Sequence, residues 1–125
     1  MEIGILQENT QAYLLMRAAT IIKSGGIVVC PTDTVYGVLC NATNEHAVQK
    51  VFELKKRPQE KALPIFVSDI AMARRFAYIS DAKAKFLERV WPGAVTILFD
   101  HKEKLSPVLT GGSTKLGIRI PISSF

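Results

Sequence analysis

Five cations gather in one short stretch of the chain. They are Lys50, Lys55, Lys56, Arg57 and Lys61, and only Glu53 and Glu60 oppose them locally. Such a cluster attracts phosphate groups, whether these belong to a nucleotide or to RNA. Pro58 disfavours a helical conformation of the residue before it, and residues two apart on an extended chain project to the same side. We therefore expect Lys55 and Arg57 to converge on one anion such as a triphosphate, while Lys56 points away. The alternative is a solvated helix end, since cations favour helix C-termini.

A second group of polar side chains follows an apolar run. Residues 27–30 are mostly β-branched and follow a glycine pair, which predicts a buried strand that ends at Pro31. Directly after it come Thr32, Asp33, Thr34 and, one residue later, Tyr36. Open α/β sheets place their ligand sites where polar groups follow a buried strand. A plain turn is the alternative, because the same residue types are common in turns.

Four sequence blocks in this order resemble the YrdC-type family, the threonylcarbamoyl-AMP synthases that begin the threonylcarbamoyl modification of adenosine in tRNA. The blocks cover residues 25–37, 50–69, 91–99 and 116–121, so the resemblance spans nearly the whole chain. It implies a nucleotidyltransferase in which L-threonine and bicarbonate form a carbamate. The carbamate then attacks the α-phosphate of ATP and expels pyrophosphate. Such catalysis depends on positioning and charge neutralisation more than on a covalent nucleophile.

The resemblance also implies roles for single residues. Lys55 and Arg57 match the family's Lys-x-Arg pair, so they are the expected catalytic and ATP-binding residues. The residues expected to bind L-threonine and the carbamate are Thr32, Thr34, Tyr36, Lys61 and Arg119, with Ser113 and Thr114 within reach of the same ligand. Mg²⁺ is expected to accompany the triphosphate, although no acidic cage for a metal is apparent.

Three features depart from the family's pattern. Ala62 replaces a more usual proline, and Val38-Leu39 replaces the usual Leu-Gly, which crowds a position where glycine permits close approach. The family's later Ser-x-Asn motif is absent, because asparagine occurs only at positions 9, 41 and 44. We therefore expect the chain to be incomplete at its C-terminal end. We also expect weak nucleotide affinity and little turnover unless another chain completes the site.

Two other functions compete with that of a synthase. A basic concave surface can bind double-stranded RNA, including tRNA, by its shape. An aromatic content of only 8% argues against stacking of single-stranded bases. YrdC-like domains also occur within larger carbamoyl-transfer enzymes, so an accessory or regulatory domain is the third possibility. For the synthase, the expected downstream partners are other tRNA-modification proteins.

Composition limits the class of protein further. With 125 residues, 48% of them hydrophobic, we expect one folded α/β domain over residues 1–125, built on a twisted mixed sheet with flanking helices. No apolar run approaches a membrane span and no signal peptide is visible, so we expect a cytoplasmic protein without membrane contact.

Cys30 and Cys40 match no metal or redox spacing and are expected to be reduced structural thiols. His46 and His101 are too isolated to form a metal site.

Capping and periodicity predict the following elements. Helices are expected from Asn9 or Thr10 to Ser24, from Asn44 to Pro58 with Ala47, Val48, Val51 and Leu54 inward, over 69–76 after a Ser68 cap, and over 81–90 after a Ser80 cap. Strands are expected over 27–30, 35–40, 64–67, 94–99 and 116–120. Trp91 is expected in the core. Arg119 should lie opposite the core side of its strand, facing either the site or solvent.

Overall fold

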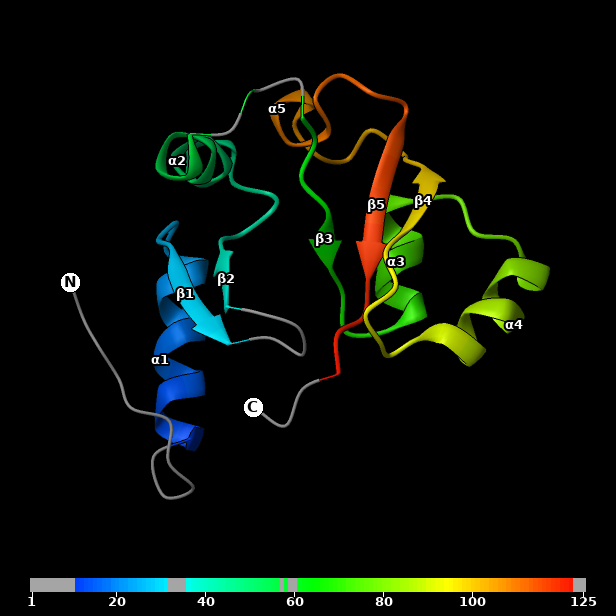
Figure 1. Ribbon diagram of the computed structural model, residues 1–125, viewed down its shortest axis with the longest axis horizontal. Helices are drawn as coiled ribbons and strands as arrows, with labels where there is room; N and C mark the ends of the chain where they lie inside the picture. The colour runs from blue at the N-terminus through cyan, green and yellow to red at the C-terminus, as the bar shows by residue number, and fades with distance from the viewer. Residues whose placement is uncertain (1–10, 32–35, 57, 59–60, 123–125) are drawn as a thin grey trace.

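The computed structural model describes residues 11–31, 36–56, 58 and 61–122, with only the backbone described for Gln11 and Tyr36, and it has the expected α/β architecture (Figure 1). The helices are α1 (Gln11–Lys23), α2 (Glu45–Lys55), α3 (Ile70–Phe76), α4 (Asp81–Val90) and α5 (Pro107–Thr110). The strands are β1 (Val28–Pro31), β2 (Tyr36–Leu39), β3 (Ile65–Phe66), β4 (Ile97–Asp100) and β5 (Lys115–Arg119). Among the described residues, the predicted order of elements is confirmed, and α5 is an addition that the sequence did not predict.

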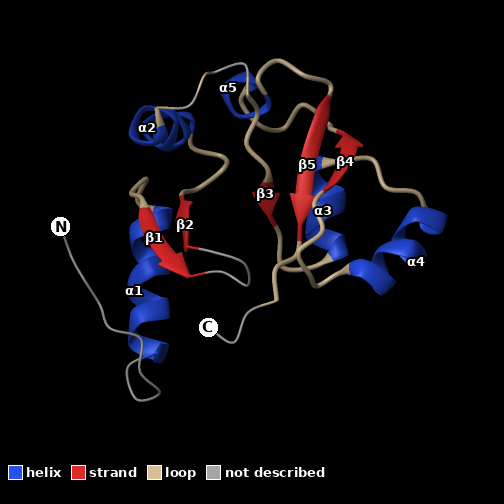
Figure 2. Ribbon diagram, viewed as in Figure 1, coloured by secondary structure: helices blue, strands red, loops and turns tan. Residues whose placement is uncertain are grey.

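The described strands form two sheets instead of one continuous sheet. Strands β1 and β2 make an antiparallel hairpin. In the other sheet, the order is β3-β5-β4, with β3 parallel and β4 antiparallel to β5. Figure 2 shows the hairpin beside α1 on one side of the molecule and the three-stranded sheet with α3 and α4 on the other, with α2 and α5 near the top of the view.

The main core lies where the three-stranded sheet packs against the helices. Its buried side chains include Val48, Phe52, Ile65, Val67, Ala73, Leu87, Trp91, Phe99, Leu116 and Ile118. Trp91 is confirmed as a core residue: its ring meets Phe99 edge-on at 6.1 Å between centroids, and its indole N–H donates to the Val95 carbonyl at 2.7 Å. The indole therefore buries its apolar body and still satisfies its one donor.

Side-chain caps begin α2, α3, α4 and α5. The Asn44 side chain accepts from the Ala47 N–H at 3.0 Å, and the Ser80 hydroxyl accepts from the Lys83 N–H at 3.2 Å, which confirms both predicted caps. The predicted Ser68 cap is wrong. Asp69 caps α3 instead, with its carboxylate accepting from the Met72 N–H at 2.7 Å. A carboxylate at this position also complements the positive end of the helix.

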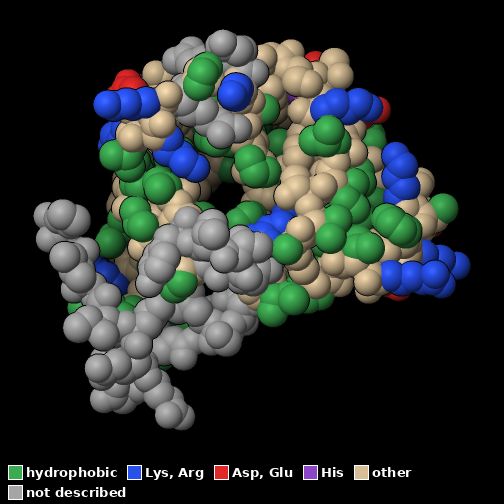
Figure 3. Space-filling model, in the orientation of Figure 1, with side chains coloured by type: hydrophobic (Ala, Val, Ile, Leu, Met, Phe, Trp, Pro, Cys, Tyr) green, Lys and Arg blue, Asp and Glu red, His purple; other side chains and the backbone are tan. Residues whose placement is uncertain are grey.

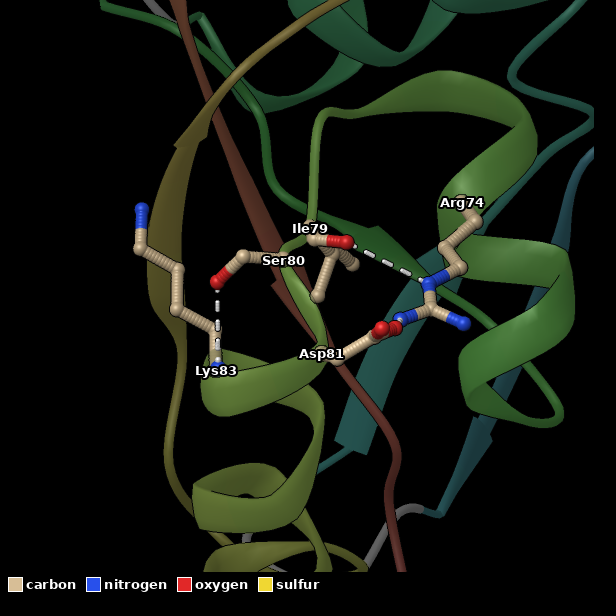
Figure 4. A network of polar contacts seen from close by, with 5 residues as sticks. All are labelled: Arg74, Ile79, Ser80, Asp81 and Lys83. Carbon is tan, nitrogen blue, oxygen red and sulfur yellow. Dashed lines mark hydrogen bonds and ion pairs between the residues drawn. The ribbon is translucent and has the colours of Figure 1, made fainter.

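A network of polar contacts joins α3 to α4 (Figure 4). The Arg74 side chain donates to the Ile79 carbonyl at 3.3 Å and to the Asp81 carboxylate at 2.9 Å. The Lys102 ammonium donates to the Arg74 carbonyl at 2.7 Å, which satisfies a group at the end of α3. These contacts hold the turn between the two helices that support the sheet.

Helix α5 connects the two parts of the molecule. The Ser106 hydroxyl accepts from the Val108 N–H at 3.1 Å and donates to the Glu45 carboxylate at 3.0 Å, at the start of α2. The Leu63 N–H donates to the Leu109 carbonyl at 2.9 Å, which anchors the chain that leads into β3. The short helix therefore fixes one end of α2 relative to the three-stranded sheet.

Several local predictions were wrong in detail. Strand β1 ends at Pro31 as expected, but it spans residues 28–31 and not 27–30. Pro31 lies within the strand because β1 is paired on one side only among the described residues and a missing N–H is tolerated there. Strand β1 is also not buried throughout, since the Val29 side chain is 62% exposed. Leu54 was expected to face inward on α2 but is 61% exposed, whereas Phe52 is buried.

Candidate functional site

An apolar cleft separates the hairpin from the three-stranded sheet. Its volume is about 430 Å³. It is lined by residues 37–43 from β2 and the loop after it, by Ile22, Val48, Val51 and Lys55 from the helices, by Leu63, Pro64, Ile65 and Phe66, and by Met72, Phe76 and Leu109. Figure 3 shows a hollow at the centre of the molecule between these two parts. The cleft has the size and apolar lining of a small-molecule site.

Lys55 places a cation in this cleft. It is the last residue of α2, and it shares a face of the helix with Val48 and Val51, which also line the cleft. Of the described lining residues, Lys55 is the one with a charged side chain. A compact ammonium group beside an apolar cleft can neutralise an anionic ligand that enters it.

The chain turns sharply after Lys55. Lys56 has the left-handed conformation, with φ 51° and ψ 39°, and its N–H bonds the Glu53 and Phe52 carbonyls. The expected extended conformation is therefore wrong for Lys55, which is helical, and for Lys56. The helix ends in the left-handed cap that is common at helix C-termini and usually occupied by glycine. Arg57 lies outside the described residues, so its convergence with Lys55 stays a prediction.

The polar segment at the end of the hairpin is described only at its borders. Thr32, Asp33 and Thr34 lie outside the described residues. The backbone of Tyr36 pairs with Pro31 at the end of the hairpin. The next residue, Gly37, lines the cleft. This segment joins β1 to β2, which borders the cleft, and binding of L-threonine by Thr32 and Thr34 stays a prediction.

Lys61 and the pair Ser113-Thr114 occupy different places. Lys61 is exposed, and its N–H donates to the Pro58 carbonyl at 3.0 Å. It lies two residues before Leu63, which lines the cleft. Ser113 and Thr114 precede β5, and their carbonyls accept from the His101 ring at 2.7 Å and the His101 N–H at 3.1 Å. Arg119 ends β5, and six extended residues separate it from Ser113 by about 20 Å along the chain. The structure therefore does not bring Ser113 and Thr114 together with Arg119.

Arg119 is buried beside the cleft. Its side chain is only 6% exposed, so the alternative of a solvent-facing arginine is wrong. The guanidinium lies 4.9 Å from the centre of the Phe66 ring and donates to the Gly93 carbonyl at 3.3 Å. Phe66 itself lines the cleft. Phe66 was not among the residues expected in the site, although pairing residues 64–67 with residues 116–120 in parallel would have placed it beside Arg119.

The two thiols and the other ionisable groups do not suggest covalent or metal chemistry. Burial raises the pKa of the Cys30 and Cys40 thiols above their ordinary value, so both remain protonated near neutral pH. Neither forms a disulfide. Within the described ranges, no three His, Cys, Asp or Glu side chains are grouped so that they could hold a metal ion. The helices found in those ranges are all too short or too polar to cross a membrane.

Comparisons with known proteins place the chain among longer relatives. The profile of the Sua5/YciO/YrdC family, described as "telomere recombination", matches residues 20–125. A putative threonylcarbamoyl-AMP synthase of Methanocaldococcus jannaschii is 39% identical over 116 residues, which cover 93% of this chain and 55% of the relative. Across five such curated relatives, the match spans 33% to 59% of the relative's own length.

Solved structures agree with this similarity. A variant of Sua5 from Pyrococcus abyssi superposes on 99% of this chain with a TM-score of 0.92 and 32% identity, and the match covers 37% of that protein. P. abyssi Sua5 complexed with L-threonine superposes on 90% of this chain with a TM-score of 0.85, again at 32% identity, and the match covers 34% of it. The observed arrangement of helices and strands is therefore found in experimental structures of longer proteins.

Proposed function

Because the chain belongs to the Sua5/YciO/YrdC family, we propose that it forms part of a threonylcarbamoyl-AMP synthase that uses L-threonine, bicarbonate and ATP. The observation that carries this proposal is the position of Lys55. Lys55 lines a mostly apolar cleft in which it is the one charged residue among those described, and it follows Val48 and Val51 on the same face of α2. A nucleotide has both parts that such a site needs, an apolar base and a charged phosphate chain.

In the proposed reaction, the amine of L-threonine and bicarbonate condense to a carbamate and release water. A carbamate oxygen then attacks the α-phosphorus of ATP, a new phosphorus–oxygen bond forms, and the bond to the bridging oxygen breaks, so that pyrophosphate leaves with the electron pair. Lys55 and Arg57 neutralise the phosphate oxygens while charge moves onto pyrophosphate. No covalent intermediate with the protein is required, which suits a cleft whose lining thiol, that of Cys40, remains protonated.

The amino acid is proposed to bind beside the phosphates. The residues assigned to it are Thr32, Thr34, Tyr36, Lys61 and Arg119. The position of Arg119 supports this assignment, because its guanidinium lies against Phe66, a residue of the cleft. The complex of P. abyssi Sua5 with L-threonine, a protein that superposes on this chain, supports the choice of amino acid. Mg²⁺ would be held mainly by the triphosphate, since the described residues offer no acidic cage.

Calorimetric titration with ATP and Mg²⁺ tests the phosphate site. We expect Lys55→Ala to weaken ATP binding by a factor of about 10 to 100, which corresponds to about 1.5–3 kcal/mol for one charge-assisted contact. Lys50→Ala is the matched control, because Lys50 is an exposed lysine of the same helix that does not line the cleft. Equal losses in both variants would indicate a diffuse basic surface and would contradict the proposed site.

Two further titrations separate the synthase from its alternatives. We expect L-threonine to bind more tightly than L-valine, because a site that pairs the threonine hydroxyl leaves its own polar groups unpaired with valine. Pyrophosphate release in the presence of ATP, L-threonine, bicarbonate and Mg²⁺ reports turnover directly. Binding of a short RNA duplex without binding of ATP would instead favour a double-stranded RNA-binding module that acts on tRNA.

A further inference from the structure

Phe66 connects the cleft to Arg119. Phe66 lines the cleft, whereas the described lining does not include Arg119. The Arg119 guanidinium lies 4.9 Å from the centre of the Phe66 ring, which is within the range of a cation–π contact. The two residues are register partners on β3 and β5, which lie side by side in Figure 1. A ligand in the cleft that touches the Phe66 ring therefore comes close to the cation as well.

The pairing of β3 with β5 puts both side chains on one face of the sheet. The preceding register pair, Ile65 and Ile118, is buried in the core, at 5% and 0% exposed. Successive side chains of a strand alternate between faces, so Phe66 and Arg119 both project to the face opposite that core. The Val67 N–H donates to the Arg119 carbonyl at 3.1 Å, which continues the pairing beyond this point. The backbone register therefore holds the ring beside the cation.

A second contact holds the guanidinium at Gly93. The Gly93 carbonyl accepts from Nη1 of Arg119 at 3.3 Å, and the Gly93 N–H donates to the Ile120 carbonyl at 2.9 Å. Two hydrogen bonds therefore attach Gly93 to the end of β5. A planar guanidinium can bind a carboxylate through two parallel N–H groups, but only when its plane has the right direction. The carbonyl fixes one nitrogen, and the Phe66 ring restricts rotation of the plane.

We propose that Phe66 is a positioning residue for the amino-acid substrate: its ring orients the Arg119 guanidinium so that this cation meets the carboxylate of L-threonine. The inference rests on the proposed function, which supplies the amino acid. Phe66 has no polar side-chain atom, so it acts on the carboxylate through Arg119. The cation is only 6% exposed, and a charge with little water around it attracts a carboxylate more strongly than an exposed one. The ring should therefore matter to the carboxylate and not to the rest of the ligand.

Calorimetric titration with two ligands tests this role. One ligand is L-threonine, and the other is L-threoninol, in which a hydroxymethyl group replaces the carboxylate. We expect Phe66→Leu to weaken L-threonine binding by a factor of about 3 to 10, because the contact that orients the cation is lost. Binding of L-threoninol should change by less than about twofold, because this ligand has no carboxylate for Arg119 to bind. Phe66→Tyr keeps the face of the ring and should restore the affinity for L-threonine.

Tyr78→Leu is the matched control. The Tyr78 ring also contacts a cation, that of Lys102 at 5.3 Å, but it is 62% exposed and does not line the cleft. This variant should leave the binding of both ligands unchanged. Equal losses for L-threonine and L-threoninol in Phe66→Leu would mean that the ring only shapes the cleft, and this outcome would overturn the proposal. An affinity for L-threonine that Phe66→Leu leaves intact would overturn it too.

NMR of the Arg119 side chain tests the orientation without any ligand. The ring current of Phe66 should shift the Nε–H resonance of Arg119, which is assigned by its disappearance in Arg119→Lys. We expect Phe66→Leu to move this resonance and Tyr78→Leu to leave it in place. An unmoved resonance in folded Phe66→Leu would refute the positioning role. If Phe66→Leu does not fold, Phe66→Met replaces it, because methionine fills irregular apolar space without a ring.

The same titrations separate this inference from the proposed function. Absence of L-threonine binding to the wild type would contradict the proposed amino-acid site, and the role of Phe66 in substrate binding would fall with it. Wild-type binding that does not depend on the Phe66 ring would contradict only the role of Phe66.

Discussion

The guanidinium of Arg119 lies 4.9 Å from the centre of the Phe66 ring, and the two residues are register partners on the parallel strands β5 and β3. The same guanidinium donates to the Gly93 carbonyl, which ties the end of β5 to the turn after α4. A buried arginine is costly unless its charge and donors are satisfied. The ring and the carbonyl therefore hold this cation in one orientation beside the cleft.

A double-mutant cycle measures the contact between Arg119 and Phe66. We expect Arg119→Lys and Phe66→Leu each to lower the free energy of unfolding, with a coupling energy of about 0.5–2 kcal/mol, because a desolvated cation–π pair lies in that range. Urea unfolding of the wild type, both single variants and the double variant gives this value. The matched control pairs Phe66→Leu with Arg75→Lys, since Arg75 lies 5.8 Å from a different ring, that of Phe76. Coupling near zero for Arg119 and Phe66 would show that the observed proximity contributes no stability.

Substitutions at Lys56 test the left-handed end of α2. We expect Lys56→Gly to raise the free energy of unfolding by about 0.5–1 kcal/mol, because glycine adopts positive φ without the steric penalty of a side chain. Lys50→Gly, in the interior of the same helix, should lower it by about 1 kcal/mol. Thermal and urea unfolding measure both variants. Destabilisation by glycine at both positions would mean that Lys56 is not left-handed in solution.

The ion pair between Asp100 and Lys115 predicts a pH-dependent contribution to stability. Their side chains are 2.7 Å apart, and the hydrogen bond and charge of Lys115 lower the pKa of the Asp100 carboxyl from its ordinary value of 3.8. A lowered folded-state pKa stabilises the fold above the ordinary value, and this contribution is lost as the pH falls through the folded-state pKa. Both groups are exposed, so high salt should weaken the pair further.

The measurement compares melting temperatures of the wild type and Lys115→Gln. We expect the variant to melt lower between about pH 5 and pH 7, and the difference to disappear as the pH falls through the lowered pKa of the Asp100 carboxyl, below 3.8. Lys104→Gln is the control, because it removes the same charge from an exposed residue without a described carboxylate partner. A difference between wild type and Lys115→Gln that stays constant down to low pH would contradict the role of the Asp100 carboxylate.

Local patterns in the sequence were sufficient to predict most of the elements. Side-chain caps and apolar spacing identify helices through interactions within a few residues, as at Asn44 and Ser80. The same local rules failed where two neighbours compete for one role, since Ser68 and Asp69 both suit an N-cap and only the carboxylate accepts from Met72. Helix α5 escaped prediction because four residues are too few to show a helical period.

The family and its expected chemistry could also be read from the sequence, because the blocks that carry them are ordered along the chain. The arrangement of the candidate site could not. Lys55 reaches the cleft only because Val48 and Val51 orient α2, and Arg119 is buried only because β3 pairs in parallel with β5 across more than fifty intervening residues. Such contacts depend on which strands become neighbours, and alternation along one strand cannot distinguish a covered face from a solvent-facing one. The division into two sheets around an apolar cleft is likewise a property of the tertiary structure alone.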